Sequence, residues 1–131
     1  AKLAGARLDG VHAPNALFVE AVLTRASLRG AELTQALFVD ADLTAADLGD
    51  ARMSMAVLHR AKAGAARFTR ADLTYADLTH AQLRGADFTD ATLFRARFHR
   101  AELGEAYFSD RSTALGDDPE LAASEDWQPT F

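Results

Sequence analysis

The sequence contains no cysteine among its 131 residues. This absence excludes a disulfide framework, a thiol nucleophile and a cysteine-based zinc site. Long apolar runs are also absent, since no uninterrupted run exceeds four residues, whereas a membrane-spanning helix needs about 18 or more. The repeating pattern is already present at Ala1, and we expect no signal peptide. We therefore expect a cytoplasmic protein without a membrane segment.

An excess of positive charge is the third feature that the sequence lacks. Its 14 lysines and arginines stand against 19 aspartates and glutamates, for a net charge of −5. This balance excludes a general basic footprint for direct nucleic-acid binding and disfavours attraction to an anionic membrane. Residues 1–111 hold 14 basic and 14 acidic side chains, whereas residues 112–131 hold five acidic ones and no basic one. The acidity therefore lies in the C-terminal segment.

A five-residue repeat fills most of the chain. Residues 1–110 divide into 22 blocks, with Ala at the first position of 21 blocks, and Leu at the third position of 13 and Phe at that of six. On an α-helix this pattern would spread around the whole cylinder, because five residues turn the side chain by about 140°. In an extended chain the first and third residues instead face the same side. Turn-forming residues recur at the fourth and fifth positions, so each block predicts a short strand followed by a corner.

Related blocks recur 20 residues apart, which predicts how many blocks close one coil. Blocks 16–20 and 36–40 both read Ala-Leu-Phe-Val followed by an acid, and Phe68, Phe88 and Phe108 are spaced by 20 residues. With four blocks to a coil, blocks 16–20 and 36–40 would stack their Phe rings on one side of the coil. The rings of Phe68, Phe88 and Phe108 would stack on the opposite side. At a strand spacing of about 4.8 Å, we predict an all-β solenoid of about 5.5 coils.

The blocks at 41–45, 71–75 and 76–80, which begin Ala-Asp-Leu-Thr, resemble the pentapeptide-repeat family. The resemblance covers residues 1–110 and implies a right-handed quadrilateral β-helix with Leu, Phe and Ala in its interior. It also implies a function. The best understood members of the family are acidic, dimeric rods similar to DNA that bind type II topoisomerases and protect gyrase from antibiotics.

Residues 111–131 fall outside the repeat and are predicted to form a capping or dimerisation tail. The segment Asp117-Asp118-Pro119 indicates the start of a short helix that runs to Ser124, because aspartate caps helix N-termini and proline fits the first turn. Three large apolar side chains lie in this segment: Leu121, Trp127 and Phe131. We expect them to seal the last coil, whose strand edges would otherwise be exposed. A homodimer contact, which the resemblance includes, is the alternative.

Two stretches of the repeat depart from the pattern: residues 11–15, where Val11 and Ala13 replace the usual alanine and leucine, and residues 51–65. Residues 51–65 hold Met53 and Met55, and alanine replaces the usual central leucine at Ala63. The loss of a buried leucine side chain costs about 2–5 kcal/mol unless neighbouring groups move in. We therefore expect the coil to narrow or kink near Ala63.

No catalytic motif is present, since the sequence has no phosphate-binding loop, nucleophile elbow or histidine spacing of a zinc enzyme. Stacking would place His59, His80 and His99 along one side, where we interpret them as solvated turn residues rather than metal ligands. Second-position aspartates such as Asp42 and Asp72 are interpreted as structural, because the family consensus carries Asp there. We expect no metal, no cofactor and a non-enzymatic role.

The outward positions of one side are rich in aliphatic residues. This group, which we call the aliphatic patch, contains Leu17, Val19, Val22, Leu37, Val39 and Val57, with His59 beside them. A contiguous apolar patch of a few hundred Å² tends to mark a binding or self-association surface. The alternative is a preference of these residues for strands, with no further role. A charged column that starts at Glu20 and Asp40 and continues through Arg60, His80 and Arg100 runs beside the patch and could orient a partner.

Three functions stay open from the sequence alone. The first is a protein-interaction rod, for which the resemblance names a type II topoisomerase as partner, although the neutral repeat region counts against DNA mimicry. The second is a pocket for a hydrophobic small molecule on the aliphatic patch, roofed by Trp127 and Phe131, where shape and orientation would assist a cyclisation. The third is a homodimeric scaffold.

Overall fold

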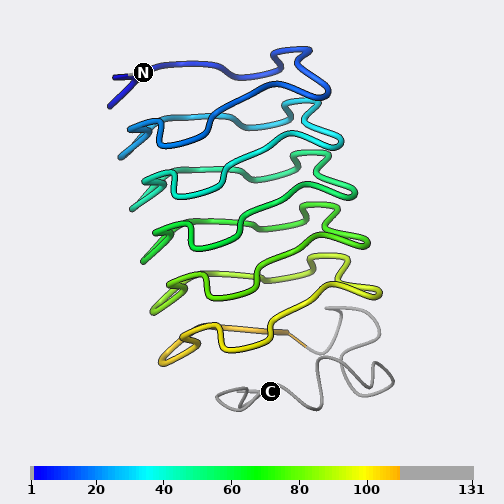
Figure 1. The fold of residues 1–131 in the computed structure, drawn as a ribbon. Coiled ribbons are helices and arrows are strands. Elements are labelled where there is room, and N and C mark those ends of the chain that lie inside the picture. The colour runs from blue at the N-terminus through cyan, green and yellow to red at the C-terminus, as the bar shows by residue number, and fades with distance from the viewer. Residues whose placement is uncertain (1, 110–131) are drawn as a thin grey trace.

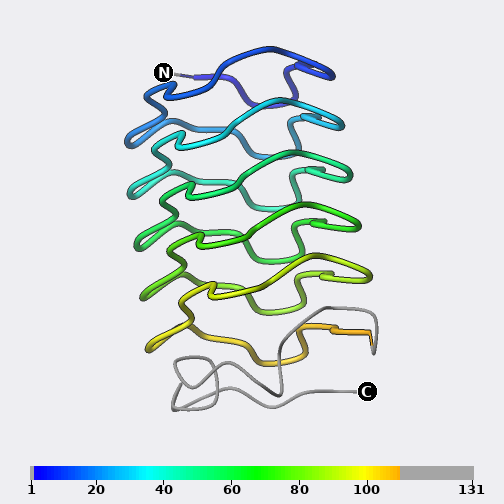
Figure 2. The same ribbon diagram turned by 90° about the vertical axis from the view of Figure 1, so that its right-hand side faces the viewer.

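The computed structural model describes residues 2–109, which form a stack of coils wound about one axis (Figures 1 and 2). Within these residues there is no helix and no multi-residue strand. The sheet consists of isolated parallel bridges, one residue to a block. Each bridge joins second positions 20 residues apart, from Lys2 and Val22 at one end to Asp87 and Tyr107 at the other. This register confirms the prediction that four blocks close one coil.

A tight turn, centred on the fourth and fifth residues, ends each block. The carbonyl oxygen of the third residue accepts a hydrogen bond from the N–H that opens the next block, as Leu43 does from Ala46 at 2.9 Å. The fifth residue has a φ angle between 56° and 73° at every corner from Gly5 to Glu105. This bond, with a positive φ at the third turn residue, is the pattern of a type II turn. The turn rotates the chain into the next side of the coil.

Main-chain hydrogen bonds along the axis hold the coils together. The N–H of Asp42 donates to the carbonyl of Ala21 in the preceding coil at 2.9 Å, and that of Leu43 donates to Lys62 in the following coil at 2.6 Å. The fifth residue adds another axial bond, as between Ala45 N–H and the carbonyl oxygen of residue 64 at 2.9 Å. Together with the turn bond, these pairs use four of the five N–H groups of such a block.

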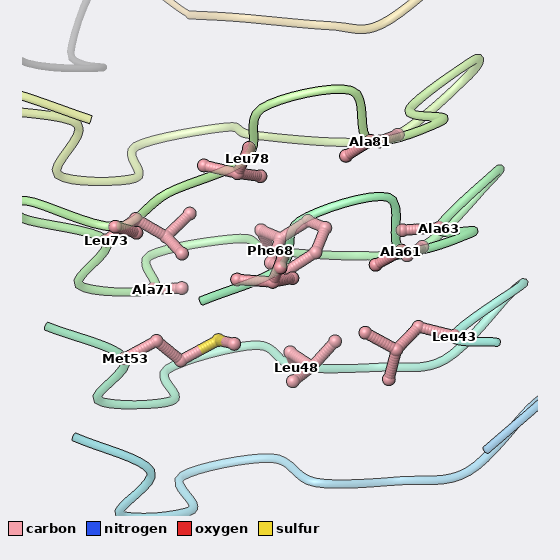
Figure 3. Close-up of a cluster of buried hydrophobic side chains, with 14 of the residues drawn as sticks. Leu43, Leu48, Met53, Ala61, Ala63, Phe68, Ala71, Leu73, Leu78 and Ala81 are labelled. Carbon is pink, nitrogen blue, oxygen red and sulfur yellow. The ribbon is translucent and has the colours of Figure 1, made fainter. Parts of the chain in front are cut away.

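The first and third side chains of each block fill the interior. From Ala21 to Phe108 these residues are buried, and Figure 3 shows Leu43, Leu48 and Met53 of one coil pointing inward. The outward second, fourth and fifth residues are half-buried or exposed, apart from Gly49 and Ser109. The fold therefore divides every block into two interior and three surface positions.

Stacked phenylalanine rings run through the core as predicted. Phe18 and Phe38 lie 4.9 Å apart between ring centroids, with 7° between their planes. The spacing is 5.0 Å both between Phe68 and Phe88 and between Phe88 and Phe108. Sequence spacing predicted both stacks because residues one coil apart must lie directly above one another.

The predicted kink at Ala63 is wrong, whereas the alternative, a narrower coil, stays a prediction. The main-chain ladder continues through this block, with Ala63 N–H bonded to the carbonyl of Gln82 at 2.7 Å and Ala65 N–H to that of Arg84 at 2.9 Å. These bonds join main-chain atoms, so they do not depend on the volume of the central side chain. Phe68 also projects into the interior of the same coil as Ala63 (Figure 3) and supplies bulk there.

Several predictions concern residues 110–131, which lie outside the described residues. They include the short helix at 117–124 and the capping or dimer role of Leu121, Trp127 and Phe131. The count of about 5.5 coils for the whole repeat also stays a prediction, although residues 2–109 follow the 20-residue register throughout.

The two phenylalanine stacks predict different losses of stability when a ring is replaced by alanine. Phe88 stacks on rings above and below it and contacts Phe98 edge-on at 5.8 Å, so Phe88→Ala should lower the free energy of unfolding by about 3–5 kcal/mol. Phe18 is half-buried in the first coil, with one stacked ring, and Phe18→Ala should cost less. Urea unfolding of both variants measures the difference. Equal losses would contradict the expectation that an inner core ring contributes more to stability than a ring in the first coil.

Candidate interaction surface

The aliphatic patch forms two columns on one side of the rod. Consecutive bridges pair Leu17 with Leu37 and Leu37 with Val57, which places the three second-position side chains in register. Val19 and Val39 occupy the fourth position of the same side, and the N–H of Glu20 binds the carbonyl of Val39 at 2.9 Å. The structure therefore brings these five aliphatic residues together as the sequence predicted.

The patch is accessible to a partner. Leu17 is 75% exposed, Val19 46% and Val22 37%, and the remaining members, Leu37, Val39 and Val57, are half-buried. Leu17 lies in the first coil and has a neighbouring coil on one side only, which accounts for its larger exposure. Val22 lies beyond the corner, at the second position of the next side, where Asp42 and then Lys62 continue its column.

Three histidines lie beyond the patch on the same side, His59 and His99 at the fourth position of their blocks and His80 at the fifth. His59 is half-buried and contacts His80 edge-on, with ring centroids 5.6 Å apart, and His80 contacts His99 at 6.4 Å. The three histidines therefore lie along one side as expected. Between residues 2 and 109, no group of three or more His, Cys, Asp or Glu side chains is arranged to hold a metal ion.

A charged corner borders the patch. The Nε and Nη2 atoms of Arg60 donate to the two carboxylate oxygens of Asp40 at 2.9 and 3.0 Å. Such a two-point arginine–carboxylate contact fixes the orientation of both groups. A shallow hollow beside this pair is lined by Glu20, Ala21, Val22, Asp40, Asp42, Arg60 and Lys62. The corner and the hollow thus join aliphatic and charged groups in one continuous surface.

Farther along the rod, the outward positions of the side that carries the patch hold charged residues. The column of Leu17, Leu37 and Val57 continues through Asp77 to Arg97. The Asp77 carboxylate accepts a hydrogen bond from the N–H of Thr79 at 2.9 Å. Arg100 lies at the following corner and Arg95 at the preceding one. Within residues 2–109, this side therefore carries the aliphatic patch in its first coils and charged side chains in its later ones.

The second-position aspartates stabilise their own turns. Asp42 accepts hydrogen bonds from the N–H and the hydroxyl of Thr44 at 3.0 and 2.7 Å, and Asp72 binds Thr74 in the same way at 3.0 and 2.6 Å. The fourth-position N–H is the one that the axial ladder does not use, so the carboxylate satisfies it locally. This geometry confirms the structural interpretation of these aspartates and explains the Asp-Leu-Thr pattern.

Ion pairs between coils neutralise acids on the side opposite the patch. Arg70 donates to both oxygens of Asp50 at 2.9 Å, and Arg29 lies 3.2 Å from Asp47 and 3.4 Å from Asp50. The hydrogen bonds from Arg70, followed by its positive charge, hold the pKa of Asp50 below its ordinary value of 3.8. The described coils therefore compensate these carboxylates instead of presenting a row of uncompensated negative charge.

Sequence reasoning missed a second apolar feature, which we call the aromatic corner. Met55, Tyr75 and Phe94 are 45%, 56% and 45% exposed. The Tyr75 and Phe94 rings meet edge-on at 5.9 Å, and the guanidinium carbon of Arg95 lies 5.7 Å from the Phe94 ring centroid. Met55 and Tyr75 occupy fifth positions 20 residues apart, so the same stacking rule applied to corners would have found them. This corner precedes the side that carries the aliphatic patch.

Asp50 predicts a small pH-dependent contribution to stability. Its lowered folded pKa means that the unfolded chain binds the proton more tightly, so the stabilisation is complete above the unfolded value and is lost as pH falls through the folded one. Urea midpoints of the parent chain should therefore fall more between about pH 5 and pH 3 than those of Asp50→Asn. The difference should be small because Arg70 and Asp50 are 55% and 46% exposed. Arg70→Gln should flatten the profile similarly, and identical profiles for all three chains would contradict the assignment.

Comparisons with known proteins agree with this architecture. A family model described as pentapeptide repeats matches in eight copies, at residues 1–38, 36–74, 51–90 and 71–110. No curated protein is similar enough to count as a relative of this chain. Across residues 2–109, no helix is long and apolar enough to cross a membrane.

Solved structures of similar proteins share the repeat. A pentapeptide repeat protein from the Arabidopsis thaliana thylakoid lumen is 28% identical, covers 83% of this chain and 69% of its own, and has a TM-score of 0.44. Rfr23 from the cyanobacterium Cyanothece 51142 is 20% identical over 84% and 88%, with a TM-score of 0.45. The plasmid-mediated fluoroquinolone resistance protein QnrB1 is 18% identical over 82% and 65%, with a TM-score of 0.50, which shows a common fold. With the family model matched across residues 1–110, the chain belongs to the pentapeptide repeat family, whose members form right-handed β-helices.

Proposed function

We propose that this chain is a non-enzymatic, cytoplasmic interaction protein that binds a protein partner through the aliphatic patch. The observation that supports this function is the register of Leu17, Leu37 and Val57 beside Val19 and Val39 on one side of the rod. Outward positions elsewhere on the described coils are mostly polar or charged. Covering this patch would remove aliphatic surface from water, at about 25 cal/mol for each Å².

Rigidity is the second property that favours binding. Each aliphatic residue is flanked by axial main-chain bonds, such as Leu37 N–H to the carbonyl of Ala16 at 2.9 Å and Phe38 N–H to that of Val57 at 2.7 Å. A backbone held in this way loses little conformational freedom when a partner binds. The patch therefore serves as a preorganised platform on which a flat apolar surface can pack.

A type II topoisomerase is the alternative partner that the family resemblance suggests. The shared fold with QnrB1 supports a rod of the appropriate kind, but DNA mimicry requires negative charge that is not compensated. Residues 1–111 are neutral overall. In addition, Asp40 and Asp50 pair with arginines of the next coil. The charge distribution therefore favours the aliphatic patch over an acidic, DNA-like surface.

The patch can be tested by photo-crosslinking in cells that naturally express the chain. A photo-reactive phenylalanine analogue at Val39 should give one heterologous crosslinked protein. The same analogue at Thr69, the fourth position of the opposite side, should not give that product. Products from both positions would contradict a binding site on the patch. A Val39 product that contains only a second copy of the chain would support the homodimeric scaffold, and a hydrophobic ligand alone would support the small-molecule pocket.

Leu37→Asp is a suitable loss-of-function variant for the same experiment. Aspartate is well suited to the second position, because Asp42 and Asp72 occupy it and bind the N–H two residues later. The variant should therefore fold with a similar melting temperature but lose the Val39 crosslink. Gln82→Asp introduces aspartate at the second position of another side and should retain it. Retention of the crosslink in Leu37→Asp would refute binding through the patch.

A gyrase assay separates the topoisomerase proposal from the patch proposal. We expect the purified chain to leave DNA supercoiling unchanged and to give no relief of quinolone-stabilised DNA cleavage, because its repeat region is neutral. Concentration-dependent inhibition of supercoiling, or protection from the drug, would instead establish the topoisomerase as a partner. The Leu37→Asp variant would then show whether the patch makes that contact.

A further inference from the structure

We propose that His59 and His80 form a binding site for a divalent transition-metal ion of the nickel and copper class. The two histidines lie on neighbouring coils of the side that carries the aliphatic patch. The sequence alone favours solvated turn residues at these positions. Three structural observations favour metal ligands instead: the distance between the rings, the angle between their planes, and the main-chain bonds that hold both residues. The site is independent of the protein partner proposed above.

The distance between the two rings suits a shared ion. Their centroids are 5.6 Å apart, and the nitrogens of an imidazole lie on the perimeter of its ring. A metal–nitrogen bond of about 2.0–2.1 Å, as in zinc sites, places two imidazole nitrogens on one ion within about 4.2 Å of each other. Small rotations of the side chains therefore bring one nitrogen of His59 and one of His80 within reach of the same ion.

The angle between the ring planes also permits coordination. An imidazole nitrogen directs its lone pair within the plane of the ring, so an ion bound by two rings must lie where their planes intersect. The planes of His59 and His80 meet at 89°. The stacked rings of Phe18 and Phe38, whose planes differ by 7°, show the nearly parallel arrangement in which no such shared point lies close to both rings. The histidine pair therefore has a geometry that one ion can bridge.

Main-chain bonds fix the two residues relative to each other. The N–H of Arg60 donates to the carbonyl of Thr79 at 3.1 Å. This bond joins the residue that follows His59 to the residue that precedes His80. The N–H of Asp40 in addition donates to the carbonyl of His59 at 3.0 Å. An ion therefore binds side chains whose attachment points are already in place, and only the rotation of two imidazole rings is lost.

The donor set defines the class of ion. Imidazole nitrogen suits nickel, copper and zinc, whereas magnesium and calcium take oxygen ligands. No third His, Cys, Asp or Glu side chain between residues 2 and 109 completes a metal-binding group, so water occupies the remaining positions. Nickel and copper accept such mixed nitrogen–oxygen sets, whereas structural zinc sites use four protein ligands. The pair therefore favours nickel and copper over zinc.

The charge next to the site is compensated. Arg60 follows His59 in the sequence, and its Nε and Nη2 atoms donate to the carboxylate of Asp40 at 2.9 and 3.0 Å. Because this carboxylate offsets the guanidinium charge, Arg60 repels a bound cation less than an unpaired arginine would.

A third imidazole lies farther away. His99 contacts His80 with ring centroids 6.4 Å apart, compared with 5.6 Å between His59 and His80. His59 is half-buried, whereas His99 is exposed, so His59 loses less side-chain freedom when it binds an ion. The ion is therefore expected between His59 and His80.

Nickel binding to the full 131-residue chain, purified without a histidine tag, tests this site. Isothermal titration calorimetry should show saturable binding of one Ni²⁺ ion per chain and no saturable binding of Mg²⁺. The melting temperature should rise with Ni²⁺ concentration, because a ligand that binds only the folded state stabilises it. The absence of saturable Ni²⁺ binding would overturn the site.

Histidine substitutions identify the ligands. His80→Asn and His59→Thr should each weaken Ni²⁺ binding at least about tenfold, which corresponds to about 1.4 kcal/mol. Asparagine tolerates the positive φ of 60° at residue 80, and threonine already occupies the fourth position of the next coil at Thr79. Both variants should therefore melt as the parent chain does when no metal is added. His12→Thr, on another side of the rod, should bind Ni²⁺ as the parent does.

The remaining histidine separates a specific pair from a general affinity for imidazole. His99→Thr should retain most of the Ni²⁺ affinity, and an equal loss in His99→Thr and His59→Thr would overturn the assigned pair. An unchanged affinity in His80→Asn, or a comparable loss in His12→Thr, would overturn the site as a whole. None of these measurements involves the protein partner, so the Val39 crosslink still tests the proposed function separately.

Discussion

The axial main-chain ladder is the constraint on which the rest of this structure depends. Bonds such as Asp42 N–H to the carbonyl of Ala21 and Leu43 N–H to that of Lys62 recur along residues 2–109. They fix the 20-residue register and bring the rings of Phe68 and Phe88 to 5.0 Å. Because the ladder uses backbone atoms, it imposes the same spacing on the core and on every outward column.

This constraint separates the residues that specify the fold from those that specify the surface. Small first-position and large third-position side chains fill the interior, while second, fourth and fifth positions vary without loss of register. The same second position can hold Asp42, which binds its own turn, or Leu37, which extends the aliphatic patch. Under the proposed function, recognition therefore depends on which outward columns are apolar and which are charged, rather than on a cleft.

The sequence predicted those features that follow from stacking alone. The register, the Phe18–Phe38 stack and the aliphatic columns all require only that residues 20 apart lie above one another. The kink expected at Ala63 failed, because side-chain volume does not control a ladder of main-chain bonds. Stacking also relates Met55 to Tyr75, but it does not predict the contact of Tyr75 with Phe94, because these two residues occupy different block positions. The tail lacks the repeat, so stacking makes no prediction for it.

Backbone conformation provides an independent reason to look at the side that carries the patch. Every fifth residue from Gly5 to Glu105 has positive φ, which costs a residue other than glycine about 1–2 kcal/mol. All four glycines with this conformation, residues 5, 10, 30 and 85, lie at the two corners that do not border the patch. The two bordering corners hold a side chain at every fifth residue, such as Met55, Tyr75 and Arg60, whereas the other two corners hold both glycines and residues such as Arg25 and Asp50. Glycine would relieve that cost and would remove the flanking apolar and charged groups, so the retained side chains support a surface that uses both corners along with the patch between them.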